Sequence, residues 1–235
     1  PCSSAASDVY KRQSLIFSVN LHAAGDLKEP LHPYWSFEGP LGTFERASLQ
    51  RGYQVYTEVC AGCHSMDYLS YRNLVEDGGP EFSEAQAKAM AAQFEVKDGP
   101  NEDGEMFLRP AILSDKFVSP WENEQQGRAA NGGAYPPDLS VMVKARPGGA
   151  DYLYSLLLGY EEPPSDMKLD DGVYYNIYAK GQKIAMPQLL YDGAVECTDG
   201  TVSTPEQMAY DVTSFLTWAA EPKLEARKRI GFKVI

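Results

Sequence analysis

Apolar side chains recur at helical spacing in several stretches of the chain, and most of these stretches begin or end at capping residues. The stretch that precedes the first cysteine pair has an apolar stripe made of Phe44, Ala47, Gly52, Val55, Tyr56 and Val59. Thr43 stands where the cap of this helix is expected. Because glycine lowers helix stability relative to alanine, Gly52 predicts a close crossing by another helix.

The best-marked helix begins near the C-terminal end of the sequence. Residues 204–207 (TPEQ) combine a threonine cap, a proline at the first helical position and a capping-box glutamine. Helical spacing of apolar residues then continues from Met208 to Pro222. We predict one helix here and expect it to cross the Gly52 helix.

Shorter helices are predicted between these two. Residues 68–74 favour a short helix before Gly78, and Ser83 with Gln86 forms a capping box ahead of a helix to about residue 94. Two further helices are predicted at residues 138–145, after two prolines, and from residue 151 to a stop at Gly159.

The connections are long. Residues 27–41 carry three prolines and predict extended chain, while residues 97–105 and 161–172 are acidic loops. Residues 173–178 and 201–202 are compatible with short strands. With 235 residues, the chain can form one large domain or a small domain with long insertions.

The charge balance is acidic, with 33 Asp and Glu against 21 Lys and Arg and a formal net charge of −12. This balance argues against a nucleic-acid partner. It favours an acidic surface that attracts a cationic partner, although solubility alone is the plainer reading.

The sequence has no apolar run of about 18 residues, the length of a membrane span. Residues 14–24 are short and apolar, which fits either the tail of a secretory signal or a buried segment. Basic residues 227–229 are followed by the mostly apolar ending 230–235. That ending is compatible with the first turns of an anchor helix.

The most specific motif is Cys60-Ala61-Gly62-Cys63-His64, a Cys-x-x-Cys-His run typical of covalent haem c attachment. Two thiols at this spacing can meet the two vinyl groups of one porphyrin, and the adjacent imidazole can reach the iron. We therefore predict one covalently bound haem c with Cys60 and Cys63 as attachment points and His64 as an iron ligand.

Two other readings of the motif are weaker. A zinc site needs a second ligand pair, and the remaining Cys2, Cys197, His22 and His32 form no compact pair. A thioredoxin-like redox pair needs a preceding strand, whereas the residues before Cys60 predict a helix.

An electron-transfer haem needs a second axial ligand, for which methionine is usual where the potential is high. Met66 is too close to His64 in sequence to reach the opposite face. Core packing is the better reading for the methionines at helical positions, Met90, Met142 and Met208. The methionines in acidic loops are Met106 and Met167.

Met186 is the favoured sixth ligand. It precedes Pro187 in a non-helical apolar segment, and the proline favours an extended backbone that presents the side chain from a loop. Arg128 is a candidate partner for a haem propionate because a guanidinium binds a carboxylate through two hydrogen bonds. A solvated loop arginine is the alternative reading for Arg128.

Several longer motifs occur in a fixed order: residues 60–64, 98–105 (DGPNEDGE), 128–131 (RAAN), 136–140 (PPDLS), 159–164 (GYEEPP), 185–187 (AMP) and 218–222 (WAAEP). On these motifs, residues 27–235 resemble the cytochrome c1 family, the haem subunits of ubiquinol:cytochrome c oxidoreductase (cytochrome bc1) complexes. The combination is far more specific than the haem motif alone.

The resemblance implies an all-α, class I cytochrome c-like fold with long loop insertions. It implies that Met186 is the axial methionine and that Arg128 lies near a propionate. It divides the chain into an N-terminal extension or signal remnant (1–26), a haem domain (27–222) and the start of a C-terminal membrane anchor (223–235).

The same resemblance implies a function within quinol–cytochrome c reductase. The family takes an electron from a Rieske iron–sulfur subunit and passes it to soluble cytochrome c, beside cytochrome b in an energy-transducing inner membrane, with the haem domain on the periplasmic or intermembrane-space side. Candidates for the acceptor surface are Glu161, Glu162, Asp166, Asp170 and Asp171. A haem enzyme or gas sensor with an exchangeable sixth ligand is the alternative function.

The chain departs from the family pattern at three places. Gly132 stands where the family often has a second asparagine, which puts any role of that side chain in doubt. Residues 1–13 match nothing in the family pattern. Cys197 lies outside the motif and is either a small buried residue or a spare thiol.

Overall fold

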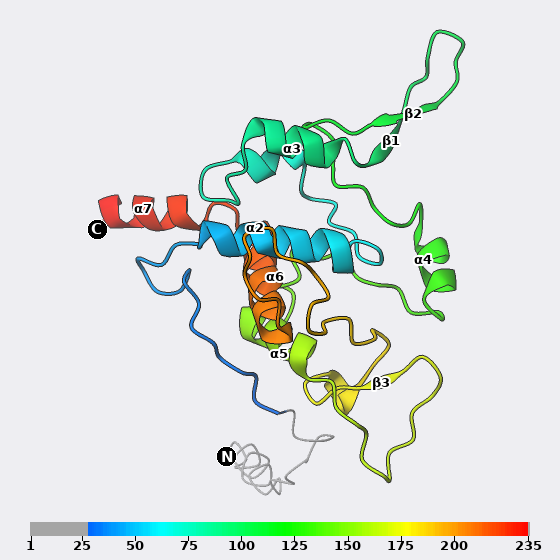
Figure 1. The fold of residues 1–235 in the computed structure, drawn as a ribbon, viewed down its shortest axis with the longest axis vertical. Helices are drawn as coiled ribbons and strands as arrows, with labels where there is room; N and C mark the ends of the chain where they lie inside the picture. The colour runs from blue at the N-terminus through cyan, green and yellow to red at the C-terminus, as the bar shows by residue number, and fades with distance from the viewer. Residues whose placement is uncertain (1–27, 235) are drawn as a thin grey trace, which may run out of the picture.

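Residues 28–234 are described by the structure, a computed structural model of the chain (Figure 1). The α-helices are α2 (Arg46–Val55), α3 (Glu84–Ala91), α4 (Glu124–Ala130), α5 (Gly149–Leu158), α6 (Pro205–Ala220) and α7 (Leu224–Val234). The other helical segments are the π-helical η1 (Tyr56–Cys60) and the 3-10 helices η2 (Tyr71–Val75) and η3 (Lys180–Gln182). The strands are β1 (Glu95–Asp98), β2 (Phe107–Pro110), β3 (Tyr174–Tyr175) and β4 (Lys183–Ile184).

The fold is helical with some strands, so the prediction of an all-α fold holds only in part. Strands β1 and β2 pair antiparallel with Glu95 opposite Pro110, and β3 pairs with β4 with Tyr174 opposite Ile184. Each pair forms a two-stranded sheet of its own. The β1–β2 strands are largely exposed and carry little apolar alternation, so their sequence has no clear strand signal.

The core lies where α2 crosses α6, as Figure 1 shows. A Cβ atom on Gly52 would lie 2.1 Å from the backbone oxygen of Asp211 and 2.7 Å from Cβ of Phe215. Glycine is therefore required for the two backbones to approach this closely. The predicted crossing of the Gly52 helix by the C-terminal helix is confirmed.

A buried carboxylate fixes the register of this crossing. Asp211 of α6 is 1% exposed and accepts hydrogen bonds from Arg51 Nε and Ser48 Oγ, both at 2.7 Å. Both donors come from α2, so this carboxylate joins the two helices. Its buried charge is paired with Arg51, and both of its oxygens accept hydrogen bonds.

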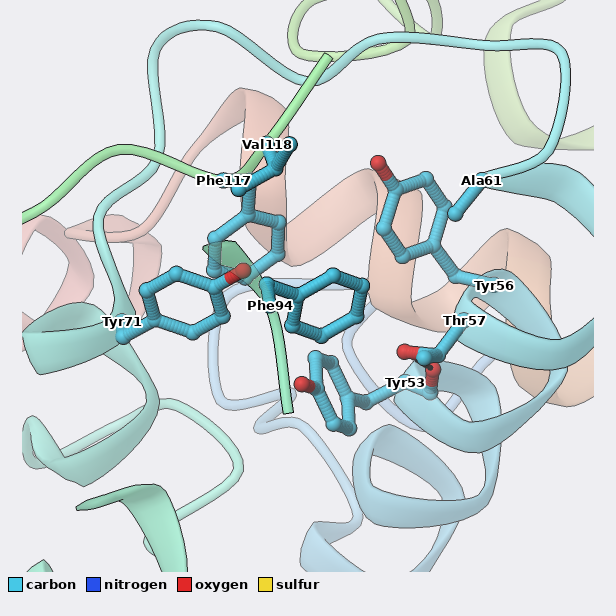
Figure 2. Close-up of a pocket in the computed structure, with 8 residues that line it drawn as sticks. All are labelled: Tyr53, Tyr56, Thr57, Ala61, Tyr71, Phe94, Phe117 and Val118. Carbon is cyan, nitrogen blue, oxygen red and sulfur yellow. Dashed lines mark hydrogen bonds between the residues drawn. The ribbon is translucent and has the colours of Figure 1, made fainter. Parts of the chain in front are cut away.

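Aromatic rings fill the space beside η1 (Figure 2). The rings of Tyr56 and Phe117 stack with centroids 6.0 Å apart, and those of Tyr71 and Phe117 lie 4.9 Å apart. The void left between them is about 10 Å³, which holds about one water molecule. This space is packed core and not a ligand site.

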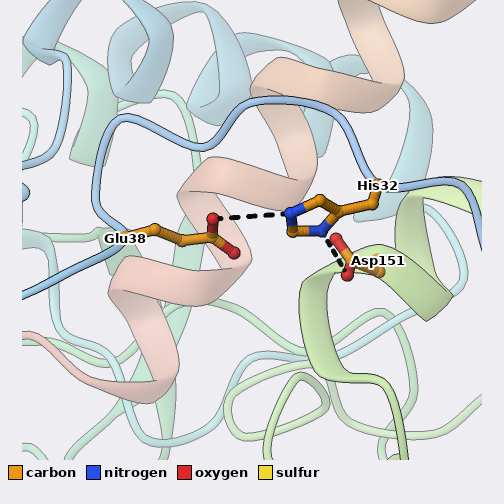
Figure 3. Close-up of side chains that lie close together, drawn as sticks. All are labelled: His32, Glu38 and Asp151. Carbon is orange, nitrogen blue, oxygen red and sulfur yellow. Dashed lines mark hydrogen bonds and ion pairs between the residues drawn. The ribbon is translucent and has the colours of Figure 1, made fainter.

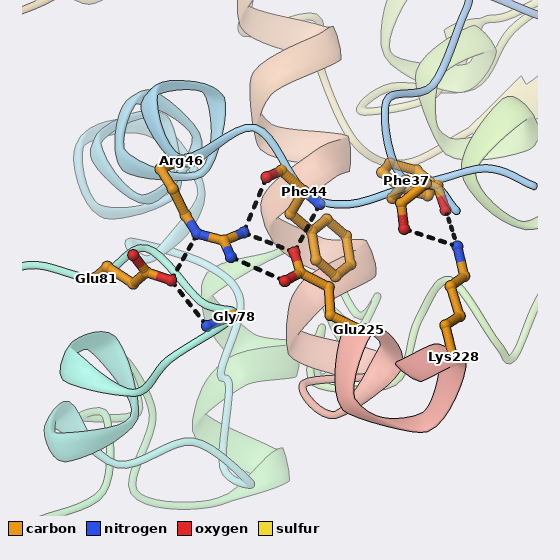
Figure 4. A network of polar contacts seen from close by, with 8 residues as sticks. Phe37, Phe44, Arg46, Gly78, Glu81, Glu225 and Lys228 are labelled. Carbon is orange, nitrogen blue, oxygen red and sulfur yellow. Dashed lines mark hydrogen bonds and ion pairs between the residues drawn. The ribbon is translucent and has the colours of Figure 1, made fainter. Parts of the chain in front are cut away.

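Helix α7 is attached to the start of α2 by charged contacts (Figure 4). The Arg46 guanidinium donates to both carboxylate oxygens of Glu225, at 2.7 and 2.9 Å, and also to Glu81. Lys228 Nζ donates to the carbonyls of Phe37 and Gly42, at 2.6 and 3.0 Å. The direction of α7 is thus set by the helix that leads to the cysteine motif.

The predicted helix boundaries are confirmed where local capping dictates them. Ser83 and Gln86 form the capping box of α3, and Thr204 accepts from the Gln207 amide with Pro205 in the first turn of α6. Helix α5 ends at Gly159. The helix predicted before Gly78 is present as the 3-10 helix η2.

Other local predictions are wrong. Glu45, and not Thr43, precedes α2, and it makes no side-chain cap. The helix predicted at residues 138–145 is absent, with turns at 140–145 in its place, and residues 201–202 form no strand. Strand β3 covers two of the residues predicted as strand at 173–178, and α4 lies in a stretch where no helix was predicted.

The predicted extension 1–26 lies outside the described residues. None of the helices within residues 28–234 is both long enough and apolar enough to cross a membrane. The anchor predicted to start in residues 223–235 therefore stays a prediction, with α7 occupying most of that range.

Candidate functional site

One large cavity brings together four of the five predicted site residues. It has a volume of about 420 Å³ and is lined by Cys60, Cys63, His64 and Met186. Much of the remaining lining is aliphatic and comes from α5, α6 and neighbouring segments, including Leu153, Leu156, Leu157, Leu190, Val212 and Leu216. The volume lies within the range of about 300–1,000 Å³ typical of small-molecule and cofactor sites.

The cysteine motif lies at the end of a widened helix. The amide of Ala61 donates to the carbonyl of Tyr56 at 2.8 Å, a π-helical bond, and the amide of His64 then donates to the carbonyl of Cys60 at 2.9 Å. These bonds turn the chain so that both thiols and the imidazole face one cavity. Neither Cys60 nor Cys63 is in a disulfide.

The His64 ring is oriented by the Pro137 carbonyl, which lies 2.7 Å from Nδ1. Because a carbonyl can only accept, Nδ1 carries the proton and Nε2 is left as the nitrogen able to bind a metal. A backbone carbonyl in this role is a common way to fix the ring of a metal-binding histidine.

Asp138 attaches the Pro137 segment to the motif. Its Oδ2 accepts from Ser65 Oγ and from the amide of Asp67, both at 2.8 Å, and the amide of Leu139 donates to the Ser65 carbonyl at 2.9 Å. Asp138 was predicted only as the start of a helix, and this contact role was not predicted. The clustering of Pro136, Pro137 and Asp138 was the signal available for it.

Burial shifts the pKa of two motif side chains, in opposite directions. It lowers the pKa of His64, which therefore stays neutral, the form in which imidazole binds a metal. Burial, with a smaller contribution from Cys63, raises the pKa of Cys60 to about 12. The Cys60 thiol is thus protonated in this protein at neutral pH.

Two methionines line the cavity, and they come from different segments. Met142 belongs to the Pro137 segment, which is held to His64, and its amide donates to the carbonyl of Leu139 at 3.2 Å. Met186 follows β4 and receives a hydrogen bond at its backbone carbonyl from Tyr160 Oη at 3.0 Å. Met186 thus reaches the cavity from a segment independent of His64.

The other described methionines lie away from the cavity lining. Met66 and Met208 are in the core, with 0% and 1% exposure, and Met106 is exposed. Met90 packs against the main core, and Met167 packs against a smaller cluster around Tyr175. The core interpretation of Met90 and Met208 is consistent with these positions, whereas Met142 is both buried and part of the lining.

The predicted propionate partner Arg128 is not among the lining residues. Its guanidinium donates to Glu124 Oε1 at 2.6 and 2.8 Å and to the Gly133 carbonyl at 2.9 Å. Arg146 is the arginine found in the lining, together with Asn131 and Tyr135. Arg146 was not predicted, since a lone arginine between loops has no distinguishing spacing.

His32, Glu38 and Asp151 form a second group of titratable side chains (Figure 3). Within residues 28–234 this is the one group of three His, Cys, Asp or Glu whose ligand atoms all lie within 4.8 Å of one another. His32 Nδ1 lies 2.7 Å from Asp151 Oδ2, and Trp35 Nε1 donates to the other carboxylate oxygen at 2.6 Å. Both oxygens of Asp151 are therefore used in hydrogen bonds, and the group is an ion pair that holds the N-terminal segment on α5.

The acidic candidates for an acceptor surface are all exposed: Glu161, Glu162, Asp166, Asp170 and Asp171. They follow Tyr160, which lines the cavity, so the acidic segment begins at the cavity rim. Cys197 is buried with its Sγ 3.1 Å from Ser203 Oγ and lies outside the cavity lining, in agreement with the reading as a small buried residue.

The donor set fits a c-type haem. It offers two thiols on one wall, a neutral imidazole with Nε2 available, a thioether from another segment and an aliphatic lining. A zinc site fits less well. Within the described residues, Cys60, Cys63 and His64 do not form a three-ligand group of the required closeness.

Comparison with known proteins gives consistent matches. The sequence model of the Cytochrome C1 family matches residues 35–235. The chain is 54% identical over 209 residues to "Cytochrome c1 2, heme protein, mitochondrial" of Arabidopsis thaliana, covering 89% of this chain and 67% of the relative. It is 52% identical over 202 residues to "Cytochrome c1, heme protein, mitochondrial" of Saccharomyces cerevisiae, covering 86% and 64%.

A third relative is named for its complex. The chain is 50% identical over 222 residues to "Cytochrome b-c1 complex catalytic subunit, mitochondrial" of Candida albicans, covering 93% of this chain and 76% of the relative. The chain therefore spans about two thirds to three quarters of the length of these three relatives.

Proposed function

The chain belongs to the cytochrome c1 family, and from this membership we propose that it is the haem-bearing electron-transfer subunit of a cytochrome b–c1 complex. It accepts an electron from a Rieske iron–sulfur subunit and passes it to a soluble cytochrome c. It thereby acts within a quinol–cytochrome c reductase and has no substrate site of its own. The observation that carries the proposal is the convergence of Cys60, Cys63, His64 and Met186 on one cavity.

Four residues hold the cofactor in this proposal. Cys60 and Cys63 would form the thioether attachments, His64 would bind the iron through Nε2, and Met186 would provide a thioether ligand from a separate segment. A bound haem c supplies a one-electron couple between ferrous and ferric iron. With His64 and Met186 both holding the iron, no position would be left for a substrate at the metal, as electron transfer requires.

The lining sets the properties of the site. The Met186 thioether is a soft, weak donor that favours reduced iron, and the aliphatic side chains disfavour the additional positive charge of the oxidised state. Arg128 stays the propionate partner that the resemblance implies, and Arg146, which lines the cavity, is proposed as a second arginine for this contact.

We place the protein in an energy-transducing inner membrane beside cytochrome b, with its haem domain on the periplasmic or intermembrane-space side. Mitochondrial relatives support this placement. The C-terminal membrane anchor that the resemblance implies for residues 223–235 stays part of the proposal.

The test is the spectrum of the purified chain with haem attached. We expect a chromophore that survives acid–acetone extraction and a low-spin ferric spectrum with the weak far-red band of methionine ligation. Met186→Leu should abolish that band, whereas Met142→Leu, a matched change at the other lining methionine, should leave it intact.

Two outcomes would count against the proposal. A high-spin unmutated protein that binds carbon monoxide readily would favour a haem enzyme or gas sensor with an exchangeable ligand. Loss of the band in Met142→Leu, with the band retained in Met186→Leu, would show that Met142 is the ligand and that the proposal for Met186 is wrong.

A further inference from the structure

The segment that carries Met186 has few hydrogen bonds of its own. Met186 lies beyond β4 and takes no part in the β3–β4 pairing. Among the described residues, one hydrogen bond reaches its backbone, from Tyr160 Oη to the carbonyl oxygen at 3.0 Å. Pro187 follows and has no amide to donate. The position of Met186 therefore depends on a side chain located 26 residues earlier in the sequence.

Tyr160 itself is part of a rigid support. Its backbone forms an antiparallel bridge with Asn176, and the amide of Ile177 donates to the Gly159 carbonyl at 2.9 Å. A Cβ on Gly159 would lie 2.5 Å from Tyr178 Cδ2, so the two segments are in direct contact. The end of α5 and the chain that leads into the Met186 hairpin are thus fixed to each other.

The buried side chain of Asn176 adds hydrogen bonds between the end of α5 and the hairpin. It is 0% exposed; its Nδ2 donates to the Leu156 carbonyl at 2.7 Å, and its Oδ1 accepts from the amides of Tyr178 and Ala179 at 3.0 and 3.2 Å. Because the Asn176 side chain is buried and both ends of its amide are hydrogen-bonded, the hairpin base has little freedom to move. The Tyr160 hydroxyl is therefore presented to Met186 from a fixed base.

We propose that Tyr160 is a positioning residue that holds the Met186 thioether in place to bind iron, acting through the Met186 backbone carbonyl. This inference rests on the proposed function, because it presupposes that Met186 is a ligand. The physical reason is that a thioether binds iron weakly, so small freedom of its backbone is enough to shift the balance towards competing ligands.

The test is Tyr160→Phe in the full chain with haem attached, which removes the hydroxyl and keeps the ring in the lining. Losing one net hydrogen bond predicts about fivefold tighter binding of imidazole to the ferric protein, in competition with Met186. It also predicts a weakened far-red band, with the covalent haem and the His64 ligand retained.

Tyr191→Phe is the matched control. Tyr191 Oη donates to the Gln188 carbonyl at 3.0 Å, so the same chemical change removes a bond of the same length from the same segment, at an exposed tyrosine outside the lining. We expect its imidazole affinity and far-red band to match those of the unmutated protein.

A second measurement guards against a folding defect. Amide hydrogen exchange in residues 185–190 should increase in Tyr160→Phe while exchange in α6 stays unchanged. An unchanged imidazole affinity in Tyr160→Phe, or an equal effect of Tyr191→Phe, would overturn the inference. Absence of the methionine band in the unmutated protein would instead reject the proposed function.

Discussion

At the scale of single residues, polar side chains that contact distant carbonyls or carboxylates arrange both the cavity and its surroundings. His64 is oriented by Pro137, Met186 is contacted by Tyr160, and Trp121 Nε1 donates to the Cys63 carbonyl at 2.9 Å. Each of these bonds joins segments far apart in sequence. The site is therefore a product of tertiary contacts even though its haem motif is local.

His32 gives a pH-dependent prediction at this scale. The hydrogen bond to Asp151 and the charges of Asp151 and Glu38 raise the pKa of His32 above its ordinary value of 6.5. Because the folded-state pKa is the higher one, protonated His32 stabilises the fold fully below the ordinary pKa. This stabilisation is lost as the pH rises through the folded-state pKa. His32→Gln should therefore be more destabilising at pH 5.5 than at pH 8.5.

The measurement is denaturant unfolding of both proteins at the two pH values. Trp35 donates to the other Asp151 oxygen and lies in the core, so it remains in place in both proteins and keeps Asp151 oriented. An equal loss of stability at both pH values would contradict a role for the histidine charge.

Single residues also show where sequence reasoning succeeds. The Cys-x-x-Cys-His spacing and the proline after Met186 are local features, and the structure brings all four of these predicted residues to one cavity. Arg128 and Arg146 are not distinguishable by local features, because which of them lines the cavity depends on how the loops pack. Tyr160 also lacked a local signal, since its hydroxyl contacts a carbonyl 26 residues away.

At the scale of elements, the α2–α6 crossing connects the cysteine motif to the core. Gly52→Ala places a methyl group 2.1 Å from the Asp211 backbone oxygen. Because that oxygen belongs to the α6 backbone, the clash can be relieved only if the two helices move apart. We expect a loss of about 1–3 kcal/mol of unfolding free energy from overpacking, which exceeds the gain in helix propensity of about 1 kcal/mol.

Gly231→Ala is the control for this prediction. Gly231 lies in α7 and a Cβ there would meet nothing within 4 Å, so this change keeps only the gain in helix propensity. Chemical denaturation of both variants tests the difference. A stability gain in Gly52→Ala would show that the helices are not held at this distance.

The starts of helices could be predicted from the sequence where capping residues next to the helix determine them. Ser83 with Gln86 and Thr204 with Pro205 mark the starts of α3 and α6, because their side chains satisfy amides of their own first turn. Residues 140–145, within the predicted helix, form turns. Asp138 Oδ1 accepts from the Ser140 amide, as a capping side chain does, while its Oδ2 accepts from Ser65 Oγ and the Asp67 amide. The local signal at Asp138 is therefore present, but it starts a series of turns and not a regular helix.

At the scale of the whole molecule, opposite charges gather at different ends. In Figure 1, α7 lies at one side with the C-terminus, and the segment that precedes β3 lies at the far lower side. The basic residues of the first end are Lys223, Arg227, Lys228, Arg229 and Lys233. The acidic segment 161–172 adjoins the cavity rim, so the proposed acceptor surface and the proposed anchor point in different directions.

This separation predicts a salt-dependent reaction with a basic soluble cytochrome c. In the proposed function, the acidic side chains that follow Tyr160 steer a basic partner towards the haem, and added salt screens that attraction over a Debye length of about 10 Å at 0.1 M. We expect the second-order rate constant of electron transfer to fall on the order of tenfold between low and moderate ionic strength. Stopped-flow measurements across a salt series test this.

The location of the charge matters as well as its amount, and two matched triple variants separate the two effects. Neutralising Glu161, Glu162 and Asp166, in the segment that begins at the rim, should slow the reaction at low salt and flatten its salt dependence. Neutralising Glu102, Asp103 and Glu105, exposed in the distant β1–β2 loop of Figure 1, changes the net charge equally but should leave both largely intact. Equal effects of the two variants would assign the salt dependence to net charge, and the rim would then have no special role in docking.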